Sequence, residues 1–247
     1  MHRYEACSDD FYINLNLNTE MELTNNRETV LHFFEMLQRR YPTMRNFYCR
    51  ERGENVLEED KDNGQYRWAT AEKKRICSGY VNPTTLESAI EQHGHVLDLA
   101  PAALAISPLD CESLNLMFGF DFTYRGNHNR LIAEALGLPP AFEGLLDTAG
   151  SSAIAYEPSL QFALDDDCRT QCRLSVESRT TAFHVKAGEF PEEQLSVYVT
   201  ARRFGSLDAG ESHADVLRKL MEVCTNTLDH YIVDQVLLPL QQTIAMK

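Results

Sequence analysis

The densest run of chemically able side chains lies at residues 124–130, which read Tyr-Arg-Gly-Asn-His-Asn-Arg. A strand that turns into a helix N-terminus presents backbone N–H groups without partners, and basic side chains beside them can hold an anion. The predicted ligand-binding residues are therefore those of this corner and of the strand before it: Asp121, Tyr124, Arg125, His128 and Arg130.

A second interpretation of the same corner needs no ligand. Gly126 and Asn127 favour a turn, and Asn127 or Asn129 can cap the following helix. The arginines would then pair with surface carboxylates. Both interpretations stay open from the sequence.

Other candidate sites are weaker. His93 and His95 are two apart, and residues with that spacing do not share a helix face. Cys168 and Cys172 lack Cys-x-x-Cys spacing, and the acidic segments 58–62 and 165–167 do not match a calcium-binding loop. The sequence therefore predicts no metal site and no cofactor. It also contains no Gly-x-Ser-x-Gly motif and no glycine-rich phosphate loop.

Three asparagines alternate along one predicted strand face at Asn14, Asn16 and Asn18, followed by Glu20. Asparagine is depleted in strands, so this pattern needs a reason beyond propensity. One reason is simple solvent exposure of that face. The other is a polar floor to a cleft, or a subunit interface rich in hydrogen bonds.

Two long strands with period-two alternation would position these residues, at 11–23 and 114–125. A helix is expected after each strand, over 25–41 with Asn25 as its cap and over 129–136. Laying Arg27 on Arg130 gives an offset of 130 − 27 = 103 and aligns the two strand-turn-helix corners. The pattern predicts two pseudo-repeated halves.

The remaining elements fill out each half. We expect a helix over 84–100, capped by Thr84 with Glu87 and ending near Pro101, and a long helix over 214–238 that Pro239 breaks or kinks. Short antiparallel strands are expected between the helices, with the predicted ranges 47–49, 55–57, 66–69, 76–81, 156–164, 169–179, 182–186 and 195–203.

The composition constrains the class of protein and its partners. The 247 residues are 43% hydrophobic and 24% charged, which is typical of a folded domain. The formal charge of −14 disfavours nucleic acid and anionic membrane surfaces as partners. Seven irregularly spaced cysteines and the absence of a long apolar run favour a cytoplasmic protein.

The sequence thus predicts an α+β fold, with antiparallel sheets covered by helices and two β-α-β-β-β-α halves at 1–105 and 106–247. The expected function is that of a non-catalytic cytoplasmic protein, which binds a partner or a small anionic ligand and forms a homo-oligomer. The alternative is an enzyme that uses acid/base groups in a cleft between the halves, with Asp121, Arg125 and His128 as its best candidates.

The oligomer expectation rests on the last helix, whose apolar stripe is longer than a half-domain of this size needs. Apolar surface that projects beyond the chain is buried most readily by a second copy. The predicted contacts of this homodimer are Leu228, Tyr231, Ile232 and Leu238.

Overall fold

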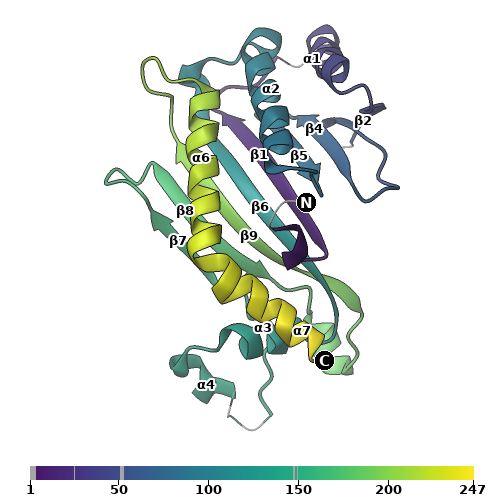
Figure 1. The fold of residues 1–247 in the computed structure, drawn as a ribbon, viewed down its shortest axis with the longest axis vertical. Helices are drawn as coiled ribbons and strands as arrows, with labels where there is room; N and C mark the ends of the chain where they lie inside the picture. Colours follow the sequence, from purple (N-terminus) through teal and green to yellow (C-terminus); the bar gives the residue numbers. More distant parts are fainter. Residues whose placement is uncertain (1–3, 25, 51–52, 147, 149) are drawn as a thin grey trace.

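The computed structural model describes residues 4–247 with the exception of 25, 51–52, 147 and 149. The fold is α+β, as the sequence predicts, but the described strands form one sheet where several sheets are expected (Figure 1). In chain order the main elements are β1 (Asp10–Thr19), α1 (Arg27–Arg40), β2 (Asn46–Cys49), β3 (Asn55–Glu58), β4 (Tyr66–Ala71), β5 (Arg75–Val81), α2 (Leu86–Leu104), β6 (Cys111–Arg125), α3 (His128–Leu136), α4 (Pro140–Leu146), β7 (Ser159–Ala163), β8 (Thr170–Glu177), α5 (Ala182–Ala187), β9 (Glu192–Phe204), α6 (His213–Thr227), the π-helical segment η3 (Leu228–Leu237) and α7 (Leu238–Ala245).

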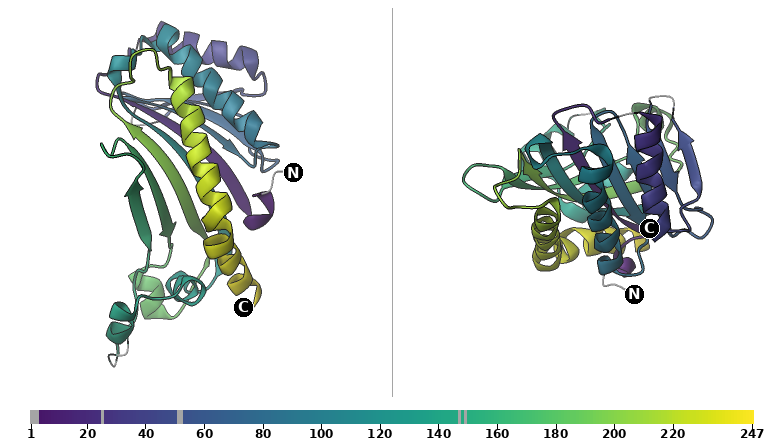
Figure 2. Two further views of the ribbon diagram at one scale, coloured as in Figure 1. Left: turned by 60° about the vertical axis from the view of Figure 1, so that its left-hand side comes forward. Right: turned by 90° about the horizontal axis from the view of Figure 1, so that it is seen from above.

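The described strands form one antiparallel sheet of nine strands in the order β2-β3-β4-β5-β1-β6-β9-β8-β7. The two long alternating strands, β1 and β6, lie side by side at its centre, with Leu15 opposite Leu116. Helices α1, α2, α6 and α7 all lie on one side of the sheet (Figure 2). Strands from both ends of the chain therefore share one sheet.

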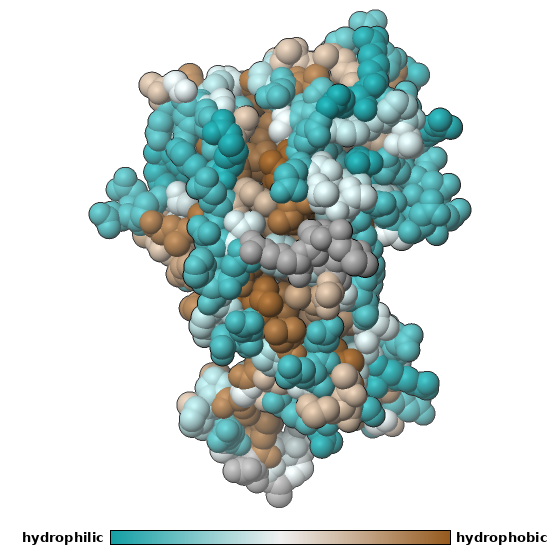
Figure 3. All heavy atoms as spheres, in the orientation of Figure 1, coloured by the Kyte–Doolittle hydropathy of each residue, from teal (hydrophilic) through white to brown (hydrophobic). Residues whose placement is uncertain are grey.

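The core lies between this sheet and its helices. Alternate residues of β1 and β6 are buried against the helices, including Phe11, Leu15, Leu116 and Phe118. The ring of Tyr4 lies 6.0 Å from that of Phe11, within a cluster of aromatic rings. On the helix-covered side, hydrophobic residues gather along a strip between α6 and α2 (Figure 3).

The last helix has a buried stripe at a spacing of four, with Leu217 and Leu237 buried beside it: Val216, Leu220, Cys224, Leu228, Ile232, Val236 and Leu240. Four residues of an α-helix rotate about 40° past one full turn, so this stripe would leave the sheet within a few turns. A π-helix closes i→i+5 hydrogen bonds and has a wider turn. The change from α6 to η3 therefore returns the stripe to the sheet.

Several predicted elements differ from those in the structure. The sequence predicts a strand over 182–186, but these residues belong to helix α5, because Thr181 and His184 form a capping box and Gly188 ends the helix at φ 69°. The α2 cap is Thr85 with Ser88, not Thr84 with Glu87. Asn26 caps α1, whereas the predicted cap Asn25 lies outside the described residues.

Two prolines do not stop their helices. Helix α2 continues through Pro101 to Leu104, because the residues after the proline, Ala103 and Leu104, are buried in the core. The last helix continues through Pro239, which follows the end of η3 at Leu237 and precedes the buried Leu240. In both places burial of the apolar face outweighs the lost hydrogen bond.

Candidate functional site

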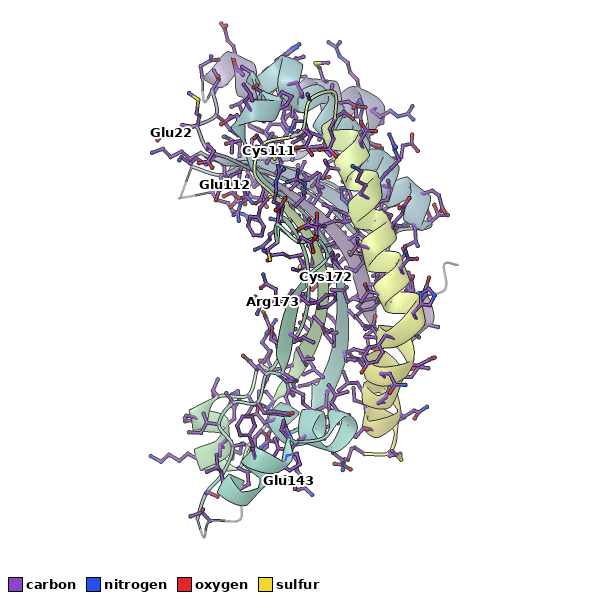
Figure 4. The ribbon with its side chains drawn as sticks, turned by 90° about the vertical axis from the view of Figure 1, so that its left-hand side faces the viewer. Glu22, Cys111, Glu112, Glu143, Cys172 and Arg173 are labelled. Atoms are coloured by element: carbon purple, nitrogen blue, oxygen red, sulfur yellow. The ribbon has the colours of Figure 1, made fainter. Side chains whose placement is uncertain are left out.

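On the side opposite helices α1, α2, α6 and α7, no helix of the described residues crosses the centre of the sheet, and we call this side the open face. It is concave, and the α4 and α5 end of the molecule projects past it (Figures 2 and 4). Because side chains alternate along a strand, the asparagines Asn14, Asn16 and Asn18 all lie on this face. Their register partners on β6 are Met117, Asn115 and Ser113, and Asn18 Nδ2 donates to Ser113 Oγ at 2.9 Å.

Two aromatic rings lie flat on the open face, each over a glycine of the neighbouring strand. A Cβ atom on Gly79 would lie 2.1 Å from Cε2 of Trp68, and one on Gly119 would lie 2.2 Å from Cε2 of Tyr12. Only glycine leaves room for a ring in that position. These glycines thus fix Trp68 and Tyr12 as flat apolar platforms within a polar face.

Trp68 lies in a hollow of about 310 Å³ on the β2–β5 part of the face, where Tyr66 and Val56 also line it. Its rim carries three ion pairs. They are Arg50 to Glu54 at 3.0 Å, Lys61 to Glu58 at 3.0 Å and Arg75 to Glu72 at 2.8 Å. Each charge here is matched within the chain, so the hollow offers an aromatic floor with a neutral rim.

Near the centre of the face, Tyr12 OH donates to Asp121 Oδ1 at 3.2 Å, and the Tyr198 ring lies 6.5 Å from the Tyr12 ring. Burial raises the pKa of the Asp121 carboxyl, and hydrogen bonds from Ser196 and Tyr12 oppose that shift. Burial and the nearby Asp121 also raise the pKa of the Tyr12 hydroxyl. Both groups therefore hold their protons more tightly than in water.

The β7–β9 part of the face has a different charge balance. Arg173 and Arg202 line one shallow depression with Gln161, Gln171 and Thr200. Figure 4 shows Arg173 on the concave side of the sheet, away from α6. Arg173 Nε donates to Ser159 Oγ at 3.0 Å, and Arg202 lies over the Phe204 ring at 5.3 Å. Neither arginine forms an ion pair with a carboxylate of the described residues.

At the centre of the open face, three buried polar atoms find no hydrogen-bond partner within the described part of the chain: Asn14 Oδ1, Asn115 Oδ1 and Arg202 Nε. Thr70 Oγ1, in the hollow beside Trp68, finds none there either. Asn115 is only 6% exposed and is the register partner of both Asn16 and Arg202. Buried polar atoms are normally paired, and one left unpaired costs about 1–3 kcal/mol. The centre of this face therefore has unmet hydrogen-bonding capacity.

The corner at 124–130 folds as a capped turn. The Arg130 N–H donates to Asn127 Oδ1 at 3.2 Å, and the His128 N–H donates to Thr180 Oγ1 at 3.0 Å. These are two of the helix N-terminal donors on which an anion site would depend. The capping interpretation therefore describes the backbone here.

His128 itself is 1% exposed and lies inside the fold. Its Nδ1 accepts from the Arg179 N–H at 3.2 Å, and its Nε2 lies 3.3 Å from the Tyr124 carbonyl oxygen, which assigns the proton to Nε2. Burial lowers the pKa of His128, which favours this neutral form. The side chain ties α3 to the end of β6.

The five predicted ligand-binding residues lie in different environments. Asp121 is 9% exposed and lies on the open face, and the exposed Arg125 is on that side too. Tyr124 has the opposite orientation, with its ring against Gly126. Arg130 lines a separate hollow of about 440 Å³ beside α3, with Asn129, Tyr156 and Phe190. These residues do not converge on one pocket.

The four predicted dimer contacts also separate by burial. Leu228 and Ile232 are 0% and 1% exposed because they pack into the core of their own chain. Tyr231 is 61% exposed, and Leu238 is partly exposed. A second copy could contact only the latter two directly.

No group of three or more His, Cys, Asp or Glu side chains in the described residues is arranged to hold a metal ion. No helix among those residues is long and apolar enough to cross a membrane. The chain matches no protein-family model, and no curated protein shows significant similarity to it.

Sequence reasoning found the asparagine row but missed its neighbours. Trp68, Tyr12, Arg173 and Arg202 come from four strands, and only the strand order brings them onto one face. A local signal did exist in two places. Gly79 and Gly119 interrupt otherwise regular strands, and an isolated glycine in a strand indicates a close approach of another group.

Proposed function

We propose that this chain is a non-catalytic binding protein that docks a protein partner on its open face. The main support for this proposal is a set of buried polar atoms at the centre of that face, on Asn14, Asn115 and Arg202, which have no partner within the described residues. Hydrogen bonds from a partner would offset the cost of leaving them unpaired. Asn14, Asn16 and Asn18 would then form hydrogen bonds with the partner instead of only with water.

The size and composition of the face support a macromolecular partner. Nine strands about 4.8 Å apart give a surface roughly 38 Å wide, enough for an interface of about 800 Å² on each side. Tryptophan, tyrosine and arginine are enriched among residues that dominate binding energy. Trp68, Tyr12 and Arg202 supply all three types on this face.

Site-specific photo-cross-linking tests this proposal. Met117 lies at the centre of the face and is partly exposed, so a benzoylphenylalanine there is tolerated sterically. Glu222 on α6 is exposed on the opposite side and provides the control position. We expect one protein to cross-link from position 117 and not from position 222.

The cross-linked protein must then bind the purified chain. Trp68 is the only tryptophan, so its fluorescence reports directly on occupation of the open face. A partner that binds without changing Trp68 emission, or cross-linking equally from both positions, would contradict docking on this face.

A second candidate function follows from Tyr12 and Asp121. A carboxyl whose pKa is raised by burial, beside a tyrosine hydroxyl, can serve as a general acid, so an acid/base enzyme is the alternative. The discriminating variant is Asp121→Asn, which keeps the shape and the hydrogen bond to Tyr12. Partner binding that survives this change favours a binding protein, whereas loss of a turnover activity would favour the enzyme.

We also propose that the two halves are a true repeat. The strand order supports this. Going outward from the central pair, β1 is followed by β5, β4 and β3, and β6 is followed by β9, β8 and β7, so in each half the last strand pairs with the first. Asn14 and Met117 face each other across that pair and are 117 − 14 = 103 positions apart, the offset that aligns the two corners. Superposing residues 10–40 on 113–143 tests the repeat, and helices α1 and α3 in unrelated positions would contradict it.

A reducing cytoplasmic location and a homodimer complete the proposal. Cys77, Cys111, Cys172 and Cys224 are buried free thiols, and this suits a reducing compartment. The exposed Tyr231 supports pairing of the last helix with a second copy.

A further inference from the structure

We infer that the protein docked on the open face presents a carboxylate side chain to Arg173 and Arg202. This inference rests on the proposed function and specifies the chemistry of the partner. It concerns the β7–β9 part of the face, whereas Trp68 anchors the other part.

The charge balance of the face supports an acidic partner. Around Trp68 the three basic groups are matched by Glu54, Glu58 and Glu72. Arg173 and Arg202 have no such match among the described residues, although the chain as a whole carries a formal charge of −14. Two unmatched arginines side by side in an acidic protein form a local site for a negative group.

The register places the two arginines close together. Gln171 lies opposite Arg202, and Arg173 lies opposite Thr200, so the arginines are diagonal neighbours on β8 and β9. Diagonal neighbours in an antiparallel pair lie about 7–8 Å apart at the backbone, within reach of long side chains. A carboxylate between them could accept hydrogen bonds from both guanidinium groups.

The hydrogen-bonding pattern distinguishes a polypeptide from a small anion. Arg202 Nε is a donor that needs an acceptor, whereas Asn14 Oδ1 and Asn115 Oδ1 are acceptors that need donors. A carboxylate ion offers acceptors only, and inorganic phosphate near neutral pH adds only one or two P–OH donors on the same small ion. A polypeptide supplies backbone N–H donors together with an acidic side chain, so it can satisfy the whole group.

Selection from a displayed library of random twelve-residue peptides provides the test, with the intact purified chain as the target. Peptides that compete with one another and change Trp68 fluorescence are taken as open-face binders. We expect these peptides to be enriched in Asp and Glu. Replacing the acidic residue by its amide should weaken binding at least about tenfold, since charge-assisted hydrogen bonds are the strong ones.

The variants are matched for charge. R173Q/R202Q removes two positive charges from the open face, and R218Q/K219Q removes two from α6, where both side chains are 69% exposed. The first variant should lose at least about tenfold in affinity for the acidic peptides and the second should not. Arg202→Lys keeps the charge but lacks Nε, so its affinity for the acidic peptides should lie between those of the two double variants. Unchanged unfolding midpoints confirm that each variant is folded.

Each other outcome has a defined meaning. Open-face peptides without acidic enrichment, or with equal affinity for R173Q/R202Q, overturn the carboxylate inference and leave the docking proposal standing. Failure to select any peptide that reports on Trp68 counts against both. Saturation of Arg173 and Arg202 by inorganic phosphate, with displacement of the peptides, would identify a small anion as the occupant and overturn the inference.

Discussion

His93 illustrates how a single residue can look functional and be part of the core. It is fully buried, and its Nδ1 lies 3.0 Å from Ser78 Oγ, a hydroxyl that accepts from Gln92 Nε2 at 2.9 Å. Burial lowers the pKa of His93 to about 3. The neutral ring therefore links α2 to β5.

A pH dependence of stability follows from His93. Its pKa is lowered in the folded state, so between pH 6.5 and 3 the unfolded chain binds a proton that the folded chain does not. The free energy of unfolding should therefore fall as the pH falls, by up to about 1.4 kcal/mol per pH unit from this group. Urea unfolding at pH 7.0, 6.0 and 5.0 measures the slope.

His93→Gln provides the control for this slope. The variant removes the titrating group. Its unfolding should therefore take up about one proton fewer, and its unfolding free energy should fall less steeply as the pH falls. His128 and His213 also have lowered pKa values through burial, and they keep part of the slope in both proteins. Equal slopes in the two proteins would show that His93 does not titrate as expected.

At the scale of elements, alternation and caps could be read from the sequence because they are local. The two long strands, the Asn127 cap alternative and the turns all follow from residue types at short spacing. Helix α5 was missed because its six residues are too few for a helical period to stand out. The open face depends on which strands become neighbours, and tertiary packing decides that.

The glycines under the rings make a prediction about β5 and β6. Gly119→Ala would place a methyl group against the Tyr12 ring, and Gly79→Ala would place one against Trp68. Each ring must move, so each variant should lose about 1–3 kcal/mol of unfolding free energy. For Gly79→Ala the fluorescence of Trp68 should change as well.

Gly94→Ala is the matched control because it makes the same substitution in helix α2, where the added methyl meets no heavy atom of the described residues within 4 Å apart from its chain neighbours and the helix backbone itself. An alanine in a helix interior is favoured over glycine by about 0.5–1 kcal/mol, so this variant should gain stability. A loss of the same size at all three positions would refute the ring-over-glycine explanation.

For the whole molecule, the homodimer is the expectation that most needs measurement. Light scattering should give about twice the chain mass of 28.1 kDa at tens of micromolar if the last helix pairs with a second copy. Because Tyr231 is exposed, Tyr231→Glu should shift the mass toward a monomer and change stability by less than about 0.5 kcal/mol. A monomer for the unmodified chain would exclude the pairing.

The central β1–β6 pair has a consequence for how the chain could be divided. Only the segment around Ala105, which is exposed, connects the strands of residues 1–105 with those of 106–247. Each piece alone would expose one side of the β1–β6 seam and part of the core between α2 and α6. Two co-expressed fragments should therefore stay unfolded apart and assemble when they meet, so a chain split at Ala105 would work as a complementation reporter.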